Sequence, residues 1–96
     1  MDQQAKPAAG GRPDVRLTLY SRTYCHLCHD MEALLRELAA ECPFQLDIVD
    51  IDADPALEER FNELVPVLMQ GGQELARYHL DSTALRLHLE RQYSQR

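Results

Sequence analysis

The chain has 96 residues, 45% of them hydrophobic, which is enough for one compact domain but not for two independent cores. Its 16 acidic and 10 basic residues give a formal net charge of -6, and this balance argues against nucleic acid or an anionic membrane as the main partner. Three cysteines are too few for a secreted disulfide scaffold, and in a reducing compartment a close cysteine pair is more often catalytic or metal-binding.

The start of the chain differs in composition from the rest. Residues 1–13 combine Gln, Ala, Pro and a Gly pair without periodicity, so we expect a flexible leader before a single domain that spans residues 14–96. The leader has no apolar segment of the kind that directs secretion, and no apolar run approaches the roughly 18 residues of a bilayer span. We therefore expect a cytoplasmic protein without a membrane partner.

Strand and helix patterns alternate in the first half of the domain. Residues 15–20 (VRLTLY) alternate apolar and polar side chains, as a half-buried strand does. A helix is expected from about His26 to about Glu41, because its apolar positions recur at steps of three and four and Pro43 cannot continue it. Residues 44–51 (FQLDIVDI) are rich in strand formers and predict a second, buried strand.

A short helix and a hairpin are predicted next. Asp54 followed by Pro55 is the pattern of an N-cap and a first helical residue, and it opens a helix that extends to about Asn62. Residues 65–69 (VPVLM) and 74–78 (ELARY) then flank a Gly-Gly turn. Two strands joined by such a turn are antiparallel.

The last predicted element is a helix that Asp81 can cap and that carries Leu85 and Leu89 on its apolar side. The first helix is long enough for a right-handed crossover between two parallel strands, so the sheet should be mixed. The predicted order is β-α-β-α-β-β-α. It describes an α/β fold in which three helices cover one mixed four-stranded sheet.

The pair Cys25-x-x-Cys28 falls between the first strand and the first helix. Cys25 is at or beside the N-cap, where unpaired backbone N–H groups and the helix dipole stabilise an anion, whereas Cys28 belongs to the apolar side. Arg22 and, when protonated, His26 add positive charge, so we expect the pKa of Cys25 to lie below that of an ordinary thiol. Cys25 is the candidate nucleophile, and Cys42 is expected to be a buried small hydrophobe.

The stretch YCHLCHD also matches two other patterns. The cysteine pair followed by His29 is the literal haem-attachment pattern, but that chemistry needs an export-dependent setting and a distal ligand, and here the motif follows a strand. A zinc site would have to recruit Cys42 or the distant His79 or His88, since no second Cys-x-x-Cys occurs. We therefore expect no metal site and favour a redox dithiol.

From residue 15 to about residue 93 the chain resembles the glutaredoxin branch of the thioredoxin superfamily, in particular the short bacterial glutaredoxin-like proteins. The resemblance is carried by YSRTYCHLC before a long helix, then by VDID, LVPVL and the Gly-Gly hairpin. It implies a thioredoxin-like fold and dithiol chemistry. It also implies that Pro66 follows a cis peptide bond and faces the cysteines, which leaves the backbone of Val65 free to pair with an extended substrate.

The resemblance implies further contacts for a thiol substrate or for glutathione. The corresponding positions are Arg22, Tyr24, Val65, Pro66, Asp81 and Ser82. This chain departs from the family pattern in two places. Glutaredoxins usually have Pro-Tyr between the cysteines, whereas this chain has His26-Leu27. They also usually have a Gly-Gly-x-Asp-type turn after the fourth strand, whereas this chain has YHLDS over residues 78–82. The redox potential is therefore not carried over, and glutathione should bind weakly.

The leading hypothesis is a dithiol-disulfide oxidoreductase. The Cys25 thiolate would attack a protein disulfide or a glutathione mixed disulfide, and Cys28 would resolve the intermediate. We expect a monomer without a bound cofactor, with glutathione as the candidate co-substrate. The alternatives are a non-enzymatic protein that holds an iron-sulfur cluster or another metal through Cys25, and an interaction domain that has kept the fold without turnover.

Overall fold

The computed structural model describes residues 15–94, and the predicted leader at residues 1–13 lies outside them. Nine elements follow one another: β1 (Arg16–Ser21), α1 (His26–Glu41), β2 (Gln45–Asp50), the 3₁₀ turn η2 (Ile51–Ala53), α2 (Pro55–Phe61), the 3₁₀ turn η3 (Asn62–Leu64), β3 (Val67–Gln70), β4 (Gln73–Arg77) and α3 (Ser82–Ser94). The predicted order β-α-β-α-β-β-α is confirmed. None of the helices in this part of the chain is long and apolar enough to cross a bilayer.

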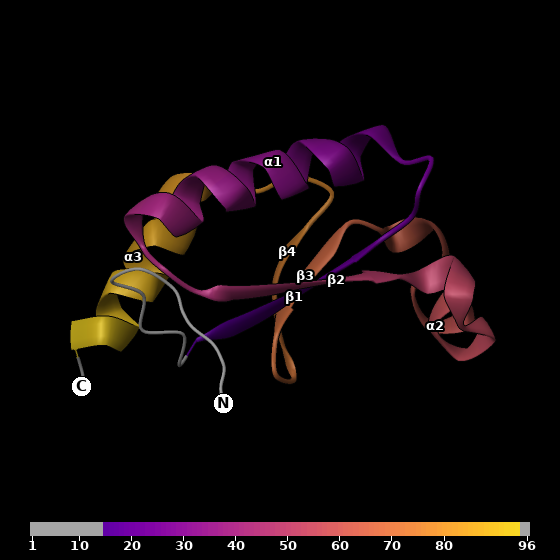
Figure 1. Ribbon diagram of the computed structural model, residues 1–96. Helices are drawn as coiled ribbons and strands as arrows, with labels where there is room; N and C mark the ends of the chain where they lie inside the picture. Colours follow the sequence, from indigo (N-terminus) through magenta and orange to yellow (C-terminus); the bar gives the residue numbers. More distant parts are fainter. Residues whose placement is uncertain (1–14, 95–96) are drawn as a thin grey trace, which may run out of the picture.

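The four strands form one mixed sheet in the order β2-β1-β3-β4. β1 runs parallel to β2 and β3 antiparallel to β4, as predicted from the crossover helix and the Gly-Gly turn. The structure adds that β1 and β3 pair antiparallel. Figure 1 shows α1 lying across one face of the sheet with α3 behind it, and α2 at the end of the sheet where β1 and β2 finish. The loop that carries the cysteine pair leaves β1 at this same end.

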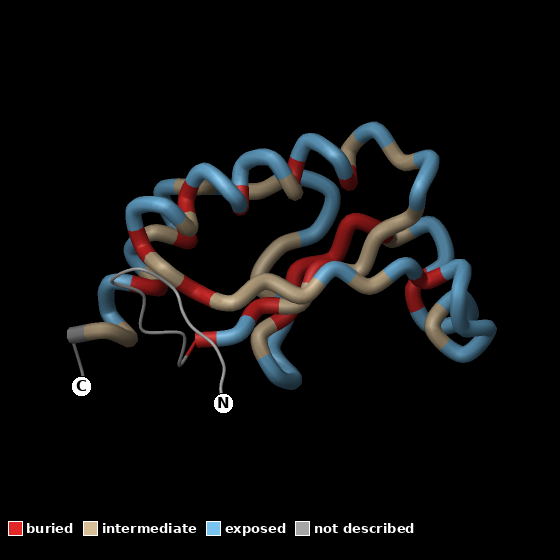
Figure 2. Tube along the Cα trace, viewed as in Figure 1, coloured by how far each residue is buried: buried red, intermediate tan, exposed pale blue. Residues whose placement is uncertain are grey.

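The main core lies between the sheet and the helices α1 and α3. Alternate side chains of β1 enter it, and α1 contributes residues spaced by four and three, because these periods place side chains on one face of each element. Figure 2 shows the buried positions of α1 on the side that faces the sheet. The buried members are Val15, Leu17, Leu19, Met31, Leu35, Leu38, Cys42, Phe44, Leu68, Leu85 and Leu89.

Local capping explains where the helices begin. Asp54 Oδ1 accepts the Ala56 N–H at 2.9 Å, directly before the proline at the first position of α2. Asp81 Oδ1 accepts the Ala84 N–H at 3.1 Å at the start of α3. Both caps were predicted, and each satisfies a backbone donor that the helix itself leaves unpaired.

Strand β3 begins at Val67, two residues later than the predicted strand over 65–69. The reason is Pro66, which has no N–H to donate to a neighbouring strand. At the hairpin, Gly71 has a φ of 57°, a left-handed conformation that glycine adopts without a steric cost. Gly71 therefore suits the turn between β3 and β4 better than a residue with a Cβ would.

The packing of α1 on the sheet can be tested with Leu35, whose side chain is 0% exposed. Leu35→Ala should lower the free energy of unfolding by about 2–5 kcal/mol, the usual cost of removing a large buried side chain and leaving a cavity. Urea denaturation followed by circular dichroism measures this loss.

Leu87 on α3 gives a matched control, since the same substitution there removes a side chain that is 52% exposed. Leu87→Ala should change the free energy of unfolding by roughly 0.5 kcal/mol or less. Equal losses in the two variants would show that α1 does not anchor the core in this way.

Candidate active site

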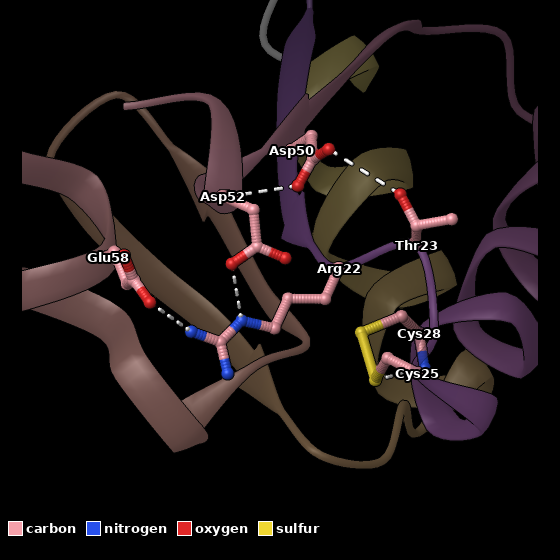
Figure 3. Close-up of polar contacts among 7 residues, drawn as sticks. All are labelled: Arg22, Thr23, Cys25, Cys28, Asp50, Asp52 and Glu58. Atoms are coloured by element: carbon pink, nitrogen blue, oxygen red, sulfur yellow. Dashed lines mark hydrogen bonds and ion pairs between the residues drawn. A yellow bond between two sulfur atoms is a disulfide. The ribbon is translucent and has the colours of Figure 1, made fainter. Parts of the chain in front are cut away.

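Cys25 and Cys28 form a disulfide at the start of α1, with their Cα atoms 5.2 Å apart. Cys25 is the N-cap residue, in extended backbone conformation, and its sulfur accepts the Cys28 N–H at 3.2 Å (Figure 3). The Cys28 side chain is only 1% exposed, whereas Cys25 is partly accessible. A substrate can therefore reach the sulfur of Cys25, and that sulfur lies where a helix stabilises negative charge.

A second, smaller core surrounds the cysteine pair. Its buried members are Cys28, Ile51, Phe61, Val65, Val67 and Met69, and Cys25 packs against them. The Val65–Pro66 peptide bond is cis, as the resemblance implied, and both residues are buried. The carbonyl oxygen of Pro66 accepts the Tyr78 N–H at 2.9 Å. Of the sequence-predicted residues, Val65 thus shares a core with the dithiol, and Pro66 follows it directly in the chain.

Arg22 leaves the end of β1 but points away from the disulfide (Figure 3). Its Nε lies 3.1 Å from Asp52 Oδ1, and its Nη2 lies 3.2 Å from Glu58 Oε2. Neither carboxylate was expected from the sequence, because Asp52 and Glu58 lie 30 and 36 residues further along the chain. The positive charge that was expected to act on Cys25 is therefore shared with two acidic partners.

Two other predicted residues next to the cysteines are exposed. His26, the first residue of α1, has its Nε2 3.4 Å from Asp30 Oδ2, one helical turn later. Such a pair carries opposite charges only when the imidazole is protonated. The Tyr24 side chain is 98% exposed, in the turn directly before Cys25. Tyr24 therefore presents a free aromatic surface beside the accessible sulfur.

Asp81 and Ser82 lie at the start of α3, apart from the cysteines. The Asp81 carboxylate caps the helix, and Ser82 lines a shallow pocket with residues from the second half of α1, among them Leu34 and Glu41. The cysteines are at the opposite, N-terminal end of α1. In the turn that precedes Asp81, where glutaredoxins usually have glycine, Tyr78 has a φ of 68°.

The residues considered for a zinc site do not meet. Cys42 is a free, buried thiol in the main core, as predicted. His79 and His88 line a separate pocket of about 300 Å³ between β4 and α3. Within residues 15–94, no group of three or more His, Cys, Asp or Glu side chains could hold a metal ion.

A mixed four-stranded sheet with a Cys-x-x-Cys pair at the start of α1 and a cis-proline directly before β3 defines a thioredoxin-like protein. Residues 16–90 match the family of the glutaredoxin-like domain (DUF836), and the chain belongs to that family.

Solved structures agree with this assignment. A protein from Nitrosomonas europaea, determined by solution NMR, is 34% identical with a TM-score of 0.67, over 92% of this chain and 98% of that one. A protein from X. campestris, determined by X-ray crystallography, is 37% identical with a TM-score of 0.64, over 77% and 95%. A mutant thioredoxin from Halobacterium salinarum, 24% identical over 84% and 76% with a TM-score of 0.58, shares the fold.

The state of the three thiols can be tested by alkylation and peptide mapping. In the oxidised native protein the main product should be a Cys25–Cys28 disulfide, and a reductant should release both thiols reversibly. Cys42 should react with iodoacetamide only after denaturation, because it is buried in the main core. A bridge from Cys42 as the main product would contradict this assignment.

Proposed function

We propose that the protein is a thiol-disulfide oxidoreductase that uses Cys25 as its nucleophile and Cys28 as its resolving thiol. The observation that carries the proposal is the position of the Cys25 sulfur, partly accessible at the N-terminus of α1 and within 3.2 Å of the Cys28 N–H. Membership of the glutaredoxin-like family supports the same chemistry.

The reaction begins with the reduced protein. The Cys25 thiolate attacks one sulfur of a substrate disulfide, the substrate S–S bond breaks, and the leaving thiolate takes up a proton. Cys28 then loses its proton and attacks the Cys25 sulfur of the mixed disulfide. The second substrate thiol leaves, so the substrate gains two electrons and two protons while the dithiol becomes a disulfide. The closeness of the two cysteines in the oxidised state supports the second step.

We propose a protein disulfide, rather than a glutathione mixed disulfide, as the main substrate. The Asp81 carboxylate is engaged in capping α3, and Tyr78 stands in the turn where the family usually has glycine. A cytoplasmic monomer without a bound metal or other cofactor fits this proposal, because a reducing compartment regenerates the dithiol after each turnover.

Trapping tests the assigned roles. Cys28→Ser should accumulate a mixed disulfide between Cys25 and its substrate, because the second attack is blocked. Non-reducing electrophoresis of extracts followed by mass spectrometry would detect the adducts and identify the partners.

The control carries Cys25→Ser together with Cys28→Ser and keeps Cys42. It should trap nothing, since its remaining thiol is buried. Adducts formed equally well by this control would exclude Cys25 as the nucleophile.

Glutathione-coupled turnover tests the substrate preference. With glutathione as the reductant of a small mixed disulfide, kcat/KM should be at least about tenfold lower than with a protein disulfide under matched reducing conditions. This difference corresponds to roughly 1.4 kcal/mol of transition-state binding. Efficient saturable turnover with glutathione would show that other residues replace the missing turn.

A further inference from the structure

The loop that leads into the cysteine pair is tied to the segment after β2. Arg22 and Thr23, in the loop that precedes Cys25, contact three carboxylates: Asp50 at the end of β2, and Asp52 and Glu58 after it. We call these three acidic residues the acidic clamp. Figure 3 shows the contacts on one side of the disulfide, with Arg22 and the clamp extending away from the sulfur atoms.

Each contact of the clamp involves a separate atom. The Nη2 of Arg22 donates to Glu58, in α2, at 3.2 Å, and its Nε lies 3.1 Å from Asp52, in η2, an ion-pair distance without hydrogen-bond geometry. The Thr23 hydroxyl donates to Asp50 at 3.5 Å, and the other oxygen of Asp50 accepts the Asp52 N–H at 2.9 Å. A planar guanidinium can face two carboxylates at once in this way, whereas the single ammonium of lysine is a point charge.

Partial burial of Arg22 distinguishes these ion pairs from contacts between fully exposed side chains. The Arg22 side chain is only 26% exposed, although its two partners are about half exposed. A partly buried charge is less screened by water and salt than an exposed one, so its position affects neighbouring ionisable groups more strongly.

We propose that Asp52 and Glu58 are positioning residues that set the reactivity of the dithiol by holding Arg22 away from Cys25. This inference rests on the proposed function. With its guanidinium held by two carboxylates, Arg22 stabilises the Cys25 thiolate less than an unpaired arginine would. The reduced state is then less favoured, and the dithiol is a stronger reductant.

The charged groups around Cys25 come from three parts of the fold. Its own helix provides the N-terminal N–H groups and the pair His26–Asp30. The loop after β1 provides Arg22, and the segment over 50–58 provides the acidic clamp. Of the side chains in the clamp, Asp52 and Glu58 contact Arg22 directly, so their removal changes both the charge near Cys25 and the position of the guanidinium.

The first measurement is the pH dependence of Cys25 alkylation by iodoacetamide in a Cys28→Ser, Cys42→Ser background. The parent midpoint should lie below about 7.5, as for other thiols at helix N-termini. Glu58→Gln and Asp52→Asn should each lower it further, by roughly half a pH unit. Arg22→Met should raise it, because the positive charge is lost while both carboxylates remain.

The second measurement is the exchange equilibrium of the Cys42→Ser protein with dithiothreitol, in which the Cys25–Cys28 disulfide gains two electrons and two protons as dithiothreitol is oxidised. Glu58→Gln should shift this equilibrium toward the reduced protein by roughly threefold, the factor that half a pKa unit represents. The matched control is Glu59→Gln, which removes the same charge from the next residue of α2 but lies outside the clamp. It should shift the equilibrium clearly less.

Combining Glu58→Gln with Arg22→Met separates the positioning of the Arg22 guanidinium from the direct effect of the Glu58 charge on Cys25. The effect of Glu58→Gln should shrink to that of Glu59→Gln when Arg22 is absent, because Glu58 then has no guanidinium to hold. Equal effects of Glu58→Gln with and without Arg22, or no effect in either, would overturn the inference. So would a change in the melting temperature of the Glu58 and Asp52 variants without any shift in midpoint or equilibrium.

Failure of this inference is distinguishable from failure of the proposed function. The midpoint and the exchange equilibrium are measured without a physiological substrate, and wild-type turnover of a protein disulfide is measured separately. If the wild type turns over a protein disulfide but the variants show no shift, only the proposed role of the clamp is rejected. If the wild type shows no turnover, the proposed oxidoreductase function itself is rejected.

Discussion

The site depends on the fact that α1 begins at Cys25. Because Cys25 is the N-cap, its sulfur takes the place of a capping oxygen and accepts the Cys28 N–H. The helical spacing then puts Cys28 one turn further along, on the face that packs inward. One structural event, the start of the helix, therefore gives one accessible and one buried sulfur within bonding distance. A start one residue earlier or later would alter both properties.

The two cores fix different elements around the start of α1. The main core fixes α1 and α3 on one face of the sheet through large apolar side chains. The smaller core, at the end of the sheet near α2, holds Cys28 together with Val65. Packed interiors resist small displacements, so the cysteines and the cis-proline keep their relative positions. The exposed surface is then free to vary in charge and in the side chains that meet a substrate.

The fold could be predicted from the sequence because its signals are local. The steps of three and four in α1, the caps at Asp54 and Asp81 and the Gly-Gly turn each involve residues close in sequence, and the structure has all of them. The cis bond before Pro66 followed only from the family resemblance, since the residues alone favour a trans bond.

The partners of Arg22 could not be predicted in the same way. Arg22 and Glu58 are separated by 36 residues, and only the packing of α2 at the end of the sheet brings them together. The same applies to Ser82, whose neighbours on α1 depend on how α3 lies across the sheet. Charges read along the sequence give the sign of a local field, but the geometry of the fold decides which charges are already paired.

Tyr78 adopts a turn conformation that usually favours glycine. Its φ of 68° is left-handed, as a glycine's could be, and its N–H still bonds to the Pro66 carbonyl oxygen. A non-glycine residue in this conformation costs of order 1 kcal/mol, which the surrounding hydrogen bond and strand pairing must offset. The turn therefore presents an exposed aromatic side chain where a glycine would present only backbone.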